Sequence, residues 1–423
     1  MKIGKVQIII TALAIAAGIF AVLVFAGVIP GLNNSSSKNK ISLTMWGTIS
    51  GKAMQPTLLD LKGSAYNIEI SYTEKNPATF ESEFVDALAR QSGPDIVIFP
   101  SEMILPEQNK LKAIPFETVG ERLFRDTFAD GTELLLTEKG VLGLPILIDP
   151  MVLFWNKDIF RNKSIADSPK TWNEFLTTSQ TLTELGSDGN ISRAGSALGI
   201  ETNVNHFKEI ISILILQTGS PIIDSKTFRF DSGGMRDALR FFIEFSDPQK
   251  FSYSWAKSMP KSQDAFLKES LAMYFAFGSE YPSIKEKNPH LNFDISEVPQ
   301  ILNGKLSLTY GKFYSLGIVN QTKNYAGALR AIQAIASKEE VRKISELSFM
   351  APARRDLLRE GTKSAPLQTN FTQAIKFRSW LDINYEKTNE IFANMVKSVY
   401  TRVKTEDQAT RDAKDQLDVL YSR

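Results

Sequence analysis

The sequence contains no cysteine among its 423 residues. This absence excludes disulfides, thiol nucleophiles and cysteine-ligated metals, and it also excludes a lipid anchor on a processed cysteine. Histidine is scarce, with His206 and His290 the only two. We therefore expect neither a histidine-rich metal site nor a histidine-dependent catalytic triad. The polar chemistry left to the chain is that of carboxylates, amides, hydroxyls and aromatic rings, which suits neutral polar ligands.

The chain also lacks a large net charge and the short motifs of common enzyme classes. Its 49 Lys and Arg residues against 47 Asp and Glu residues give a net charge of +2, with no clustered basic face, so no nucleic-acid partner is expected. It has no Gly-x-Ser-x-Gly, no phosphate-binding glycine-rich loop and no His-Glu-x-x-His. We expect no catalytic residue, metal or cofactor.

The sequence contains enough apolar residues to form more than one hydrophobic core. Hydrophobic residues make up 43% of the chain and charged residues 23%, which are ordinary proportions for a globular protein. A length of 423 residues exceeds one ordinary core and indicates two domains.

The N-terminal segment is the longest apolar run. Residues 6–29 hold no charge, follow Lys2 and Lys5, and would span about 36 Å as a helix. We predict a single-pass anchor within 1–32 that places the rest of the chain on the extracytoplasmic side of the cell membrane.

A cleaved signal peptide is the alternative for this segment. Its apolar core is usually shorter, but cleavage after Ala26 satisfies the small-residue rule. Both alternatives export the remaining chain. Residues 33–40, rich in Asn, Ser and Lys, predict a flexible linker.

The first part of the exported chain alternates between strand and helix patterns. Strands are expected at 41–46, 66–72 and 95–99, with helices at 56–62 and 79–90 between them. The last of these strands is continuously apolar, as in a parallel sheet covered on both faces. The order predicts an α/β fold.

The middle of the chain continues in the same style. Residues 140–156 form an extended apolar run interrupted by Pro145 and Pro150, which suggests one strand leaving the first domain and another entering the second. The remaining patterns predict helices at 169–185, 209–217, 234–245 and 325–337, strands at 271–277 and 316–319, and a polar loop at 186–195.

The C-terminal tail predicts a pair of helices. Apolar residues recur at every fourth position at Ile391, Met395, Val399 and Val403. Thr405 has the character of an N-cap, with Asp407 and Gln408 in the following turn, and the last helix should end near Tyr421.

Five stretches, in this order, resemble the family 1 extracellular solute-binding proteins, which include maltose- and oligosaccharide-binding proteins. They are GLPILIDPMVLFWNKDIF (143–160), PKTWNEFL (169–176), ESLAMYFAFGSEY (269–281), AGALRAIQAIASKEEVRKI (326–344) and MVKSVYTRVKTEDQATRDAKDQLDVL (395–420). The resemblance extends over about residues 41–423.

The resemblance implies a two-lobed, type II periplasmic-binding-protein-like α/β fold with a hinge between the lobes. The lobes would comprise 41–147 with 317–366, and 150–312 with 370–423. It implies a monomer that captures a small polar solute, such as a carbohydrate, in the cleft between the lobes and delivers it to the permease of an ABC importer.

Ligands of open α/β sheets bind beyond the carboxyl ends of strands, and that rule and the family motifs indicate the same positions. The expected ligand-binding residues are Trp46, Thr48, Ser101, Glu102, Asp149, Asn203, Glu280, Tyr281, Phe313, Tyr314 and Arg354. One position departs from the family. Many sugar binders carry a tryptophan two residues after the strand glycine, where this chain has Glu280, so the site could also suit a cationic solute or an amino sugar.

Two other functions remain open at this point. The same scaffold could sense a ligand or bind a membrane partner instead of importing a solute. An anchored glycoside hydrolase would need two carboxylates at a defined separation, one with a raised pKa, and no local motif indicates such a pair.

Overall fold

The computed structural model describes residues 40–63, 66–220, 222–223, 230 and 234–422, which form two compact units. The smaller unit holds the described residues up to Ile98 together with Leu316–Leu347, and the larger unit holds Phe99–Ser315 with the described residues from Ser348 onward. The predicted N-terminal anchor, its alternative cleavage site and all of the linker except Lys40 lie outside the described residues. Within the described part, no helix has the length and apolarity to cross a bilayer.

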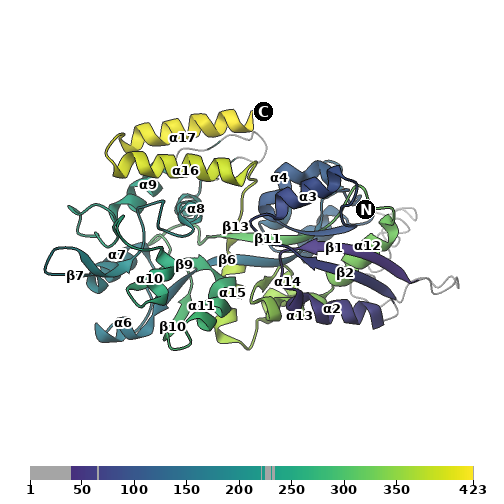
Figure 1. The fold of residues 1–423 in the computed structure, drawn as a ribbon, viewed down its shortest axis with the longest axis horizontal. Coiled ribbons are helices and arrows are strands. Elements are labelled where there is room, and N and C mark those ends of the chain that lie inside the picture. The colour runs from purple at the N-terminus through teal and green to yellow at the C-terminus, as the bar shows by residue number, and fades with distance from the viewer. Residues whose placement is uncertain (1–39, 64–65, 221, 224–229, 231–233, 423) are drawn as a thin grey trace, which may run out of the picture. The chain divides into compact units, whose positions relative to one another are not determined.

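The smaller unit is built on three parallel strands. β1 (Ile41–Gly47) pairs in parallel with β2 (Ile68–Glu74) on one side and β3 (Ile96–Pro100) on the other. Its helices are α2 (Gly51–Gly63), α3 (Phe80–Ala89), α12 (Tyr325–Ile335) and α13 (Lys338–Ser348), labelled in Figure 1. The predicted β-α-β-α-β order is confirmed.

Helix α2 begins earlier than predicted. Pro56 is a typical first residue of a helix, but α2 starts five positions before it, at Gly51. The Gly51 amide donates to the Glu74 carboxylate at 2.7 Å, so the start of the helix is fixed by a residue at the end of β2. Gly47, at the end of β1, is required there because a Cβ atom would come within 2.8 Å of the Ile98 Cβ.

The larger unit is organised around one long strand, β6 (Leu144–Asn156). The prediction of two separate strands in this stretch is wrong, because the strand is continuous through both prolines. β6 pairs with β12 (Ala351–Pro352) up to Ile148 and with β9 (Leu271–Phe277) from Met151 onward, both antiparallel. Asp149 and Pro150 lie between these two pairings.

Further strands complete the sheet of the larger unit. β10 (Phe293–Ser296) pairs with β6, β8 (Ile191–Ser196) with β9, β7 (Glu184–Leu185) with β8, and β13 (Phe377–Arg378) with β11 (Thr309–Ile318). A separate ribbon joins β4 (Leu136–Thr137) to β5 (Gly140–Val141). β8 lies within the stretch predicted to be a polar loop. Its pattern is not strand-like, and the strand forms because β9 offers it a buried edge.

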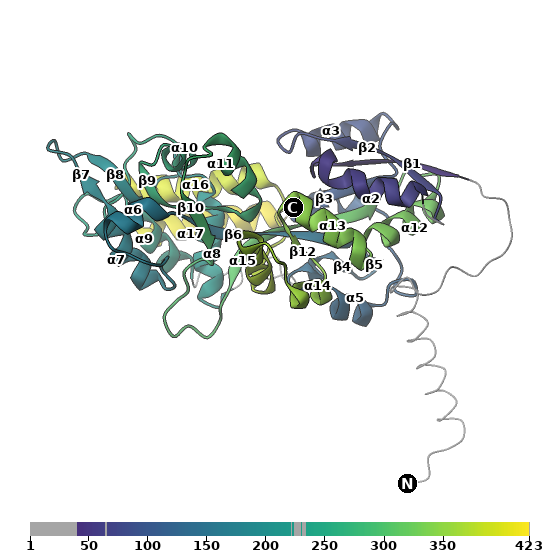
Figure 2. The ribbon, with the colours of Figure 1, turned by 90° about the horizontal axis from the view of Figure 1, so that it is seen from below.

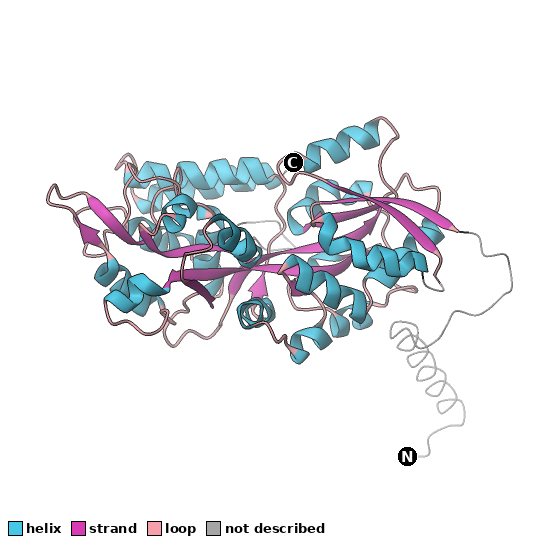
Figure 3. Ribbon diagram, turned by 60° about the horizontal axis from the view of Figure 1, so that its bottom comes forward, coloured by secondary structure: helices cyan, strands magenta, loops and turns pink. Residues whose placement is uncertain are grey.

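Helices lie around these strands, as the ribbon coloured by secondary structure shows (Figure 3). They are α4 (Ile104–Glu107), α5 (Glu121–Thr127), α6 (Lys157–Asn162), α7 (Trp172–Leu182), α8 (Phe207–Gln217), α9 (Met235–Glu244), α10 (Ser262–Leu267), α11 (Tyr281–Lys287), α14 (Arg355–Glu360), α15 (Ala365–Ile375), α16 (Tyr385–Tyr400) and α17 (Glu406–Tyr421). Every residue of α8 is buried, and its sequence is apolar except at Lys208, Glu209, Ser212 and Gln217.

The C-terminal helix pair forms as predicted. α16 and α17 lie side by side in Figures 1 and 2, and α9 packs against both. Thr405 is the N-cap of α17 and forms a full capping box with Gln408, in which each side chain accepts a bond from the other's backbone amide.

Trp172 lies in the core of the larger unit, and its indole N–H donates to Gln217 at 2.6 Å.

Candidate functional site

Asp149 occupies the gap between the two strand pairings of β6 and is almost fully buried, with 1% of its surface exposed. Its carboxylate accepts two bonds from Ser279, from the backbone N–H at 3.0 Å and from the hydroxyl at 2.6 Å. Burial raises the pKa of Asp149 to about 6 from an ordinary 3.8, although Lys312 and these two bonds act in the opposite direction. A carboxylate in this environment is a strong acceptor with few competing water molecules.

Lys312 brings a cation to the same place from β11. The strand approaches β6 closely because residue 311 is glycine, where a Cβ atom would lie 3.1 Å from the Pro150 Cα. The Lys312 ammonium lies 4.3 Å from the centre of the Phe277 ring, an arrangement that stabilises a cation.

Several charged and polar groups raise the pKa of Lys312. Burial alone would lower the pKa of this lysine, but the pKa is raised because Tyr314, Glu102, Asp149 and Glu209 interact with the ammonium. Three carboxylates and Tyr314, which is 7% exposed, thus stabilise the charge of one ammonium through space. We call Glu102, Asp149, Glu209, Lys312 and Tyr314 the Lys312 cluster.

The two flanking carboxylates of the cluster are placed by separate elements. Glu102 belongs to a short 3-10 turn, Ser101–Met103, directly after β3, and accepts from the Ser101 hydroxyl at 3.3 Å. Glu209 lies in the first turn of α8, where a negative charge is favoured by the helix dipole, and accepts from the Tyr385 hydroxyl at 2.8 Å.

Glu280 forms a network of its own beside this cluster. One oxygen of its carboxylate lies 2.6 Å from His206 Nε2, and the other accepts from Gln263 at 2.7 Å and from the Tyr274 hydroxyl at 3.0 Å. Burial alone would raise the pKa of Glu280, but these three bonds outweigh it and the pKa is lowered. The side chain is therefore ionised and committed to protein partners.

The other predicted residues of the larger unit serve the fold in this structure. Asn203 donates to the carbonyls of Ala256 and Met259 and accepts from the Trp255 indole. Phe313 is fully buried.

Two further predicted residues make contacts inside the larger unit. Tyr281 stacks on Phe349 with ring centres 4.8 Å apart, and Arg354 binds the Asp356 carboxylate with two nitrogens. Their ligand roles remain predictions, and the chemistry proposed below does not depend on them.

Trp46 and Thr48 belong to the smaller unit. Trp46 is half-buried at the end of β1, and the Lys75 ammonium lies 3.8 Å from the centre of its ring. Thr48 lies in the turn that follows. The predicted placement of the ligand between two lobes remains a prediction.

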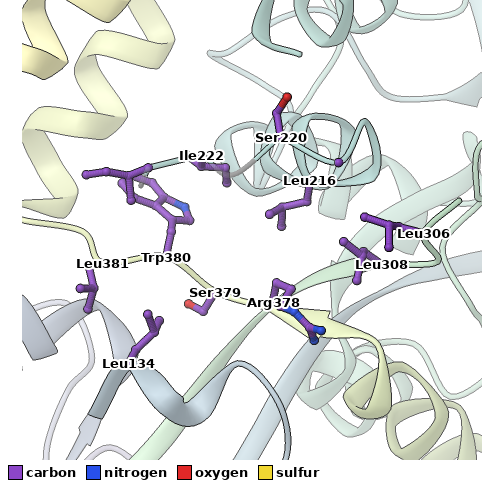
Figure 4. A pocket seen from close by; sticks show the side chains of 12 residues that line it. Leu134, Leu216, Ser220, Ile222, Leu306, Leu308, Arg378, Ser379, Trp380 and Leu381 are labelled. Atoms are coloured by element: carbon purple, nitrogen blue, oxygen red, sulfur yellow. The ribbon is translucent and has the colours of Figure 1, made fainter. Parts of the chain in front are cut away.

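The larger unit also contains an apolar pocket of about 290 Å³, shown in Figure 4. It is lined by Leu134, Leu216, Gly219, Ser220, Ile222, Ile223, Leu306, Leu308, Arg378, Ser379, Trp380 and Leu381. None of the predicted site residues lines it and it holds no carboxylate. For a polar solute, the Lys312 cluster is the better match because hydroxyl groups need charged or polar partners when they leave water.

Several residues of this region were not predicted as ligand-binding residues. His206, Glu209, Ser279 and Tyr385 all contact the predicted carboxylates or their neighbours. The available signal was the start of α8, where His206, Lys208 and Glu209 precede an otherwise apolar run. Polar residues at the end of a buried helix need partners, and these partners are distant in sequence.

Comparison with known proteins gives consistent matches. The model of the family described as bacterial extracellular solute-binding protein matches residues 61–370. A Brucella abortus (strain 2308) protein named as a binding protein is 22% identical over 289 residues, which cover 66% of this chain and 68% of that one.

Solved structures share the fold at low sequence identity. The cyclic alpha-maltosyl-1,6-maltose binding protein of Arthrobacter globiformis matches with a TM-score of 0.76 and 14% identity over 90% of this chain and 99% of that one. An ABC transporter solute-binding protein of Thermotoga lettingae, bound to alpha-D-tagatose, matches with a TM-score of 0.71 and 17% identity over 90% and 100%. The chain therefore has an α/β, periplasmic-binding-protein-like fold.

Proposed function

The chain belongs to the bacterial extracellular solute-binding proteins, and from this premise we propose that it captures a carbohydrate and delivers it to the permease of an ABC importer. Membership confirms the family indicated by the sequence motifs. It also confirms the expectation that the chain is not an enzyme, because the family is one of binding proteins. The ABC importer is supported by the description of the Thermotoga lettingae neighbour as an ABC transporter component.

The observation that carries the carbohydrate proposal is the position of Lys312 over Phe277 on the strand that packs against buried Asp149, where the charges of three carboxylates act on its ammonium. Carboxylates accept strong hydrogen bonds from sugar hydroxyls, and an ammonium donates to them. The cluster has both kinds of group at one place, with Glu102, Asp149 and Glu209 around a single cation. Its net negative charge disfavours an anionic solute.

Aromatic groups beside the cluster support the same proposal. The Tyr314 hydroxyl contacts Lys312, and the ring of Tyr385 is 39% exposed while its hydroxyl donates to Glu209. Apolar faces of pyranose rings pack on aromatic rings of this kind. We propose that Tyr385 is a ring that contacts the sugar, with the Lys208 ammonium near the same ring.

We also propose that residues 6–29 hold the protein at the cell membrane, with the described units on the extracytoplasmic side. The support is the uncharged run and the two preceding lysines. Fractionation of cells that express the full chain, followed by mass determination of the mature protein, tests this. A mature chain that begins after Ala26 would contradict the anchor and leave the exported location intact.

The first experiment on the solute is thermal unfolding of the full chain, in a detergent without a sugar headgroup, against neutral oligosaccharides, amino sugars, uronic acids and polyamines. A compound that binds only the folded state at 100 times its Kd stabilises it by about 2.7 kcal/mol. We expect stabilisation by a neutral oligosaccharide or an amino sugar, with no turnover.

The matched control is Lys312→Met, which keeps the length of the side chain and removes its charge. At the same concentration of the compound, stabilisation should fall in this variant to about half or less of that of the native chain. Stabilisation by uronic acids alone, or an unchanged response in Lys312→Met, would contradict the proposed site.

A further inference from the structure

His206 has a left-handed backbone conformation. It immediately precedes α8 with a φ angle of 58°, in the left-handed region that non-glycine residues seldom adopt. Such a conformation persists only where the surroundings hold it. Here the holding contacts are the bond of Nε2 to Glu280 and the packing of the imidazole edge on the Phe277 ring, with ring centres 5.1 Å apart.

The contact with Glu280 fixes which ring nitrogen changes its proton. An ionised carboxylate is only an acceptor, so Nε2 carries a proton whether the imidazole is neutral or charged. Protonation therefore occurs at Nδ1, which is a hydrogen-bond donor in the charged ring and an acceptor in the neutral ring. Among the described residues, none forms a hydrogen bond with Nδ1 of His206.

The charged neighbours of His206 belong to the region described above. The groups that act on it are Glu280, Glu209 and Lys312. Burial alone would lower the pKa of His206, but the bond and charge of Glu280, aided by Glu209, raise it overall. Phe277 has the His206 ring against it at 5.1 Å and the Lys312 ammonium at 4.3 Å from its centre, so His206 and Lys312 share one aromatic neighbour.

We infer that His206 is a ligand-binding residue whose Nδ1–H donates to an oxygen atom of the solute, and that Glu280, held by Tyr274 and Gln263, is the residue that positions it. This inference rests on the proposed carbohydrate-binding function and specifies how one subsite works. At this subsite the chain thus offers the solute a hydrogen-bond donor on a ring that Glu280 holds in place. The subsite accordingly selects a solute with an oxygen acceptor at that position.

The inference predicts a pH dependence of affinity with a defined sign. If the solute accepts a bond from Nδ1–H, binding raises the pKa of His206 further. Affinity is then full below the pKa of the free protein and is lost as pH rises through the pKa of the complex. If His206 were purely structural, any pH dependence of affinity in this range would come from Asp149, whose pKa is about 6, and His206→Asn would leave that dependence unchanged.

The experiment is an NMR titration of the two imidazole rings in the full chain, with and without maltotetraose. His290 is the only other histidine, so His290→Gln assigns the signals and serves as the control. Glu280→Gln keeps the shape of the positioning side chain and removes its charge. We expect maltotetraose to raise the pKa of His206 and leave that of His290 unchanged, and Glu280→Gln to move the pH midpoint of affinity downward.

A second variant tests the contact without a titration. Asparagine tolerates the left-handed conformation better than most residues, so His206→Asn preserves the start of α8. Because hydrogen bonds from charged donors contribute about 1.5–3 kcal/mol, we expect its affinity for maltotetraose to fall by about tenfold or more at acidic pH.

The outcomes separate this inference from the function on which it rests. If maltotetraose stabilises the protein against unfolding but the pKa of His206 does not move, the inference is wrong and the proposed function stands. If neither an oligosaccharide nor an amino sugar stabilises the protein, both the carbohydrate assignment and the inference fail.

Discussion

The larger unit contains two lysines that differ in their surroundings. Lys208 is bound within the fold, and Lys312 lies in the proposed binding site. Lys208 is 2% exposed and donates to Asp382 and to Thr388, each at 2.6 Å, while its ammonium also lies 4.1 Å from the centre of the Tyr385 ring. Lys312 instead interacts with three carboxylates, and none of them is its sole partner.

The difference lies in how completely the protein satisfies each cation. Around Lys208, one carboxylate and one hydroxyl form a closed set, since the Thr388 hydroxyl also donates to the same Asp382 oxygen at 2.8 Å. Around Lys312, negative charge exceeds positive charge, which leaves hydrogen-bonding capacity for a solute. A closed network therefore indicates a role in folding, and an unbalanced one indicates a role in binding.

The largest effect expected from this comparison is on the stability of the Lys208 network. Lys208→Met leaves the Asp382 carboxylate buried at 3% exposure without its cation, and we expect a loss of about 3–5 kcal/mol in the free energy of unfolding. Urea unfolding followed by tryptophan fluorescence measures it. The double variant Lys208→Met with Asp382→Leu should recover most of the loss, and a double variant as unstable as the single one would show that the ion pair is not the cause.

A second prediction concerns the pH dependence contributed by Asp149. Its pKa is raised in the folded protein to about 6, so its favourable contribution is present below the ordinary value of 3.8 and is lost as pH rises through about 6. A shift of about 2 pH units corresponds to about 3 kcal/mol.

Asp149→Asn, which keeps the shape and cannot ionise, tests this. Its free energy of unfolding relative to the native chain should increase by up to about 3 kcal/mol between pH 4 and pH 6. The exposed Asp126 offers a control, Asp126→Asn, for which no such change is expected. Parallel pH profiles for the native chain and Asp149→Asn would mean that the aspartate is not perturbed.

The third prediction is that Lys312→Met affects carbohydrate affinity more than stability, the opposite of what is expected for Lys208→Met. Lys312→Met should reduce the affinity for the stabilising carbohydrate by about tenfold to a hundredfold, corresponding to about 1.4–2.7 kcal/mol. Its cost in unfolding free energy should be smaller than that of Lys208→Met, because the partners of Lys312 share their charge with other groups. Calorimetric titration gives the affinity. Equal losses of affinity in both lysine variants would remove the distinction between them.

The smallest effect is expected away from both lysines, at the start of α17. Thr405→Ala removes one side of the capping box and should cost about 1 kcal/mol in the free energy of unfolding, with unchanged carbohydrate affinity. Thr401→Ala, at the preceding exposed threonine, is the matched control and should cost less, since its hydroxyl donates only to the Lys397 carbonyl. A loss of affinity in Thr405→Ala would mean that the helix pair contributes to the site.

Local patterns predicted most elements of the fold. The 271–277 strand has the predicted bounds, and the helix after Thr405 begins where its cap indicates. The helix predicted at 169–185 is shorter, Trp172–Leu182. Patterns failed where a distant partner decides the structure. The 191–196 strand forms on an edge that β9 provides, and the helix at Gly51 begins where Glu74 binds its amide.

The sequence predicted the kinds of residue in the site better than it predicted which individual residues lie together there. Asp149, Glu102 and Tyr314 follow from strand ends and family motifs, and the structure brings them together around Lys312. Asn203 was expected for the same reasons, yet its amide is fully used within the fold. Sequence periodicity does not show whether an amide side chain forms its hydrogen bonds within the protein or leaves them for a ligand.

The sequence by itself determined the α/β alternation, the helix caps, the absence of thiol chemistry and the family, because these depend on neighbouring residues or on ordered motifs. Only the tertiary structure decided which charges are satisfied. His206 and Glu280 are 74 positions apart, and Lys208 and Asp382 are 174 apart. A hydrogen bond or ion pair between such residues exists only after the chain has folded, and the balance of these pairs is what separates the binding surface from the core.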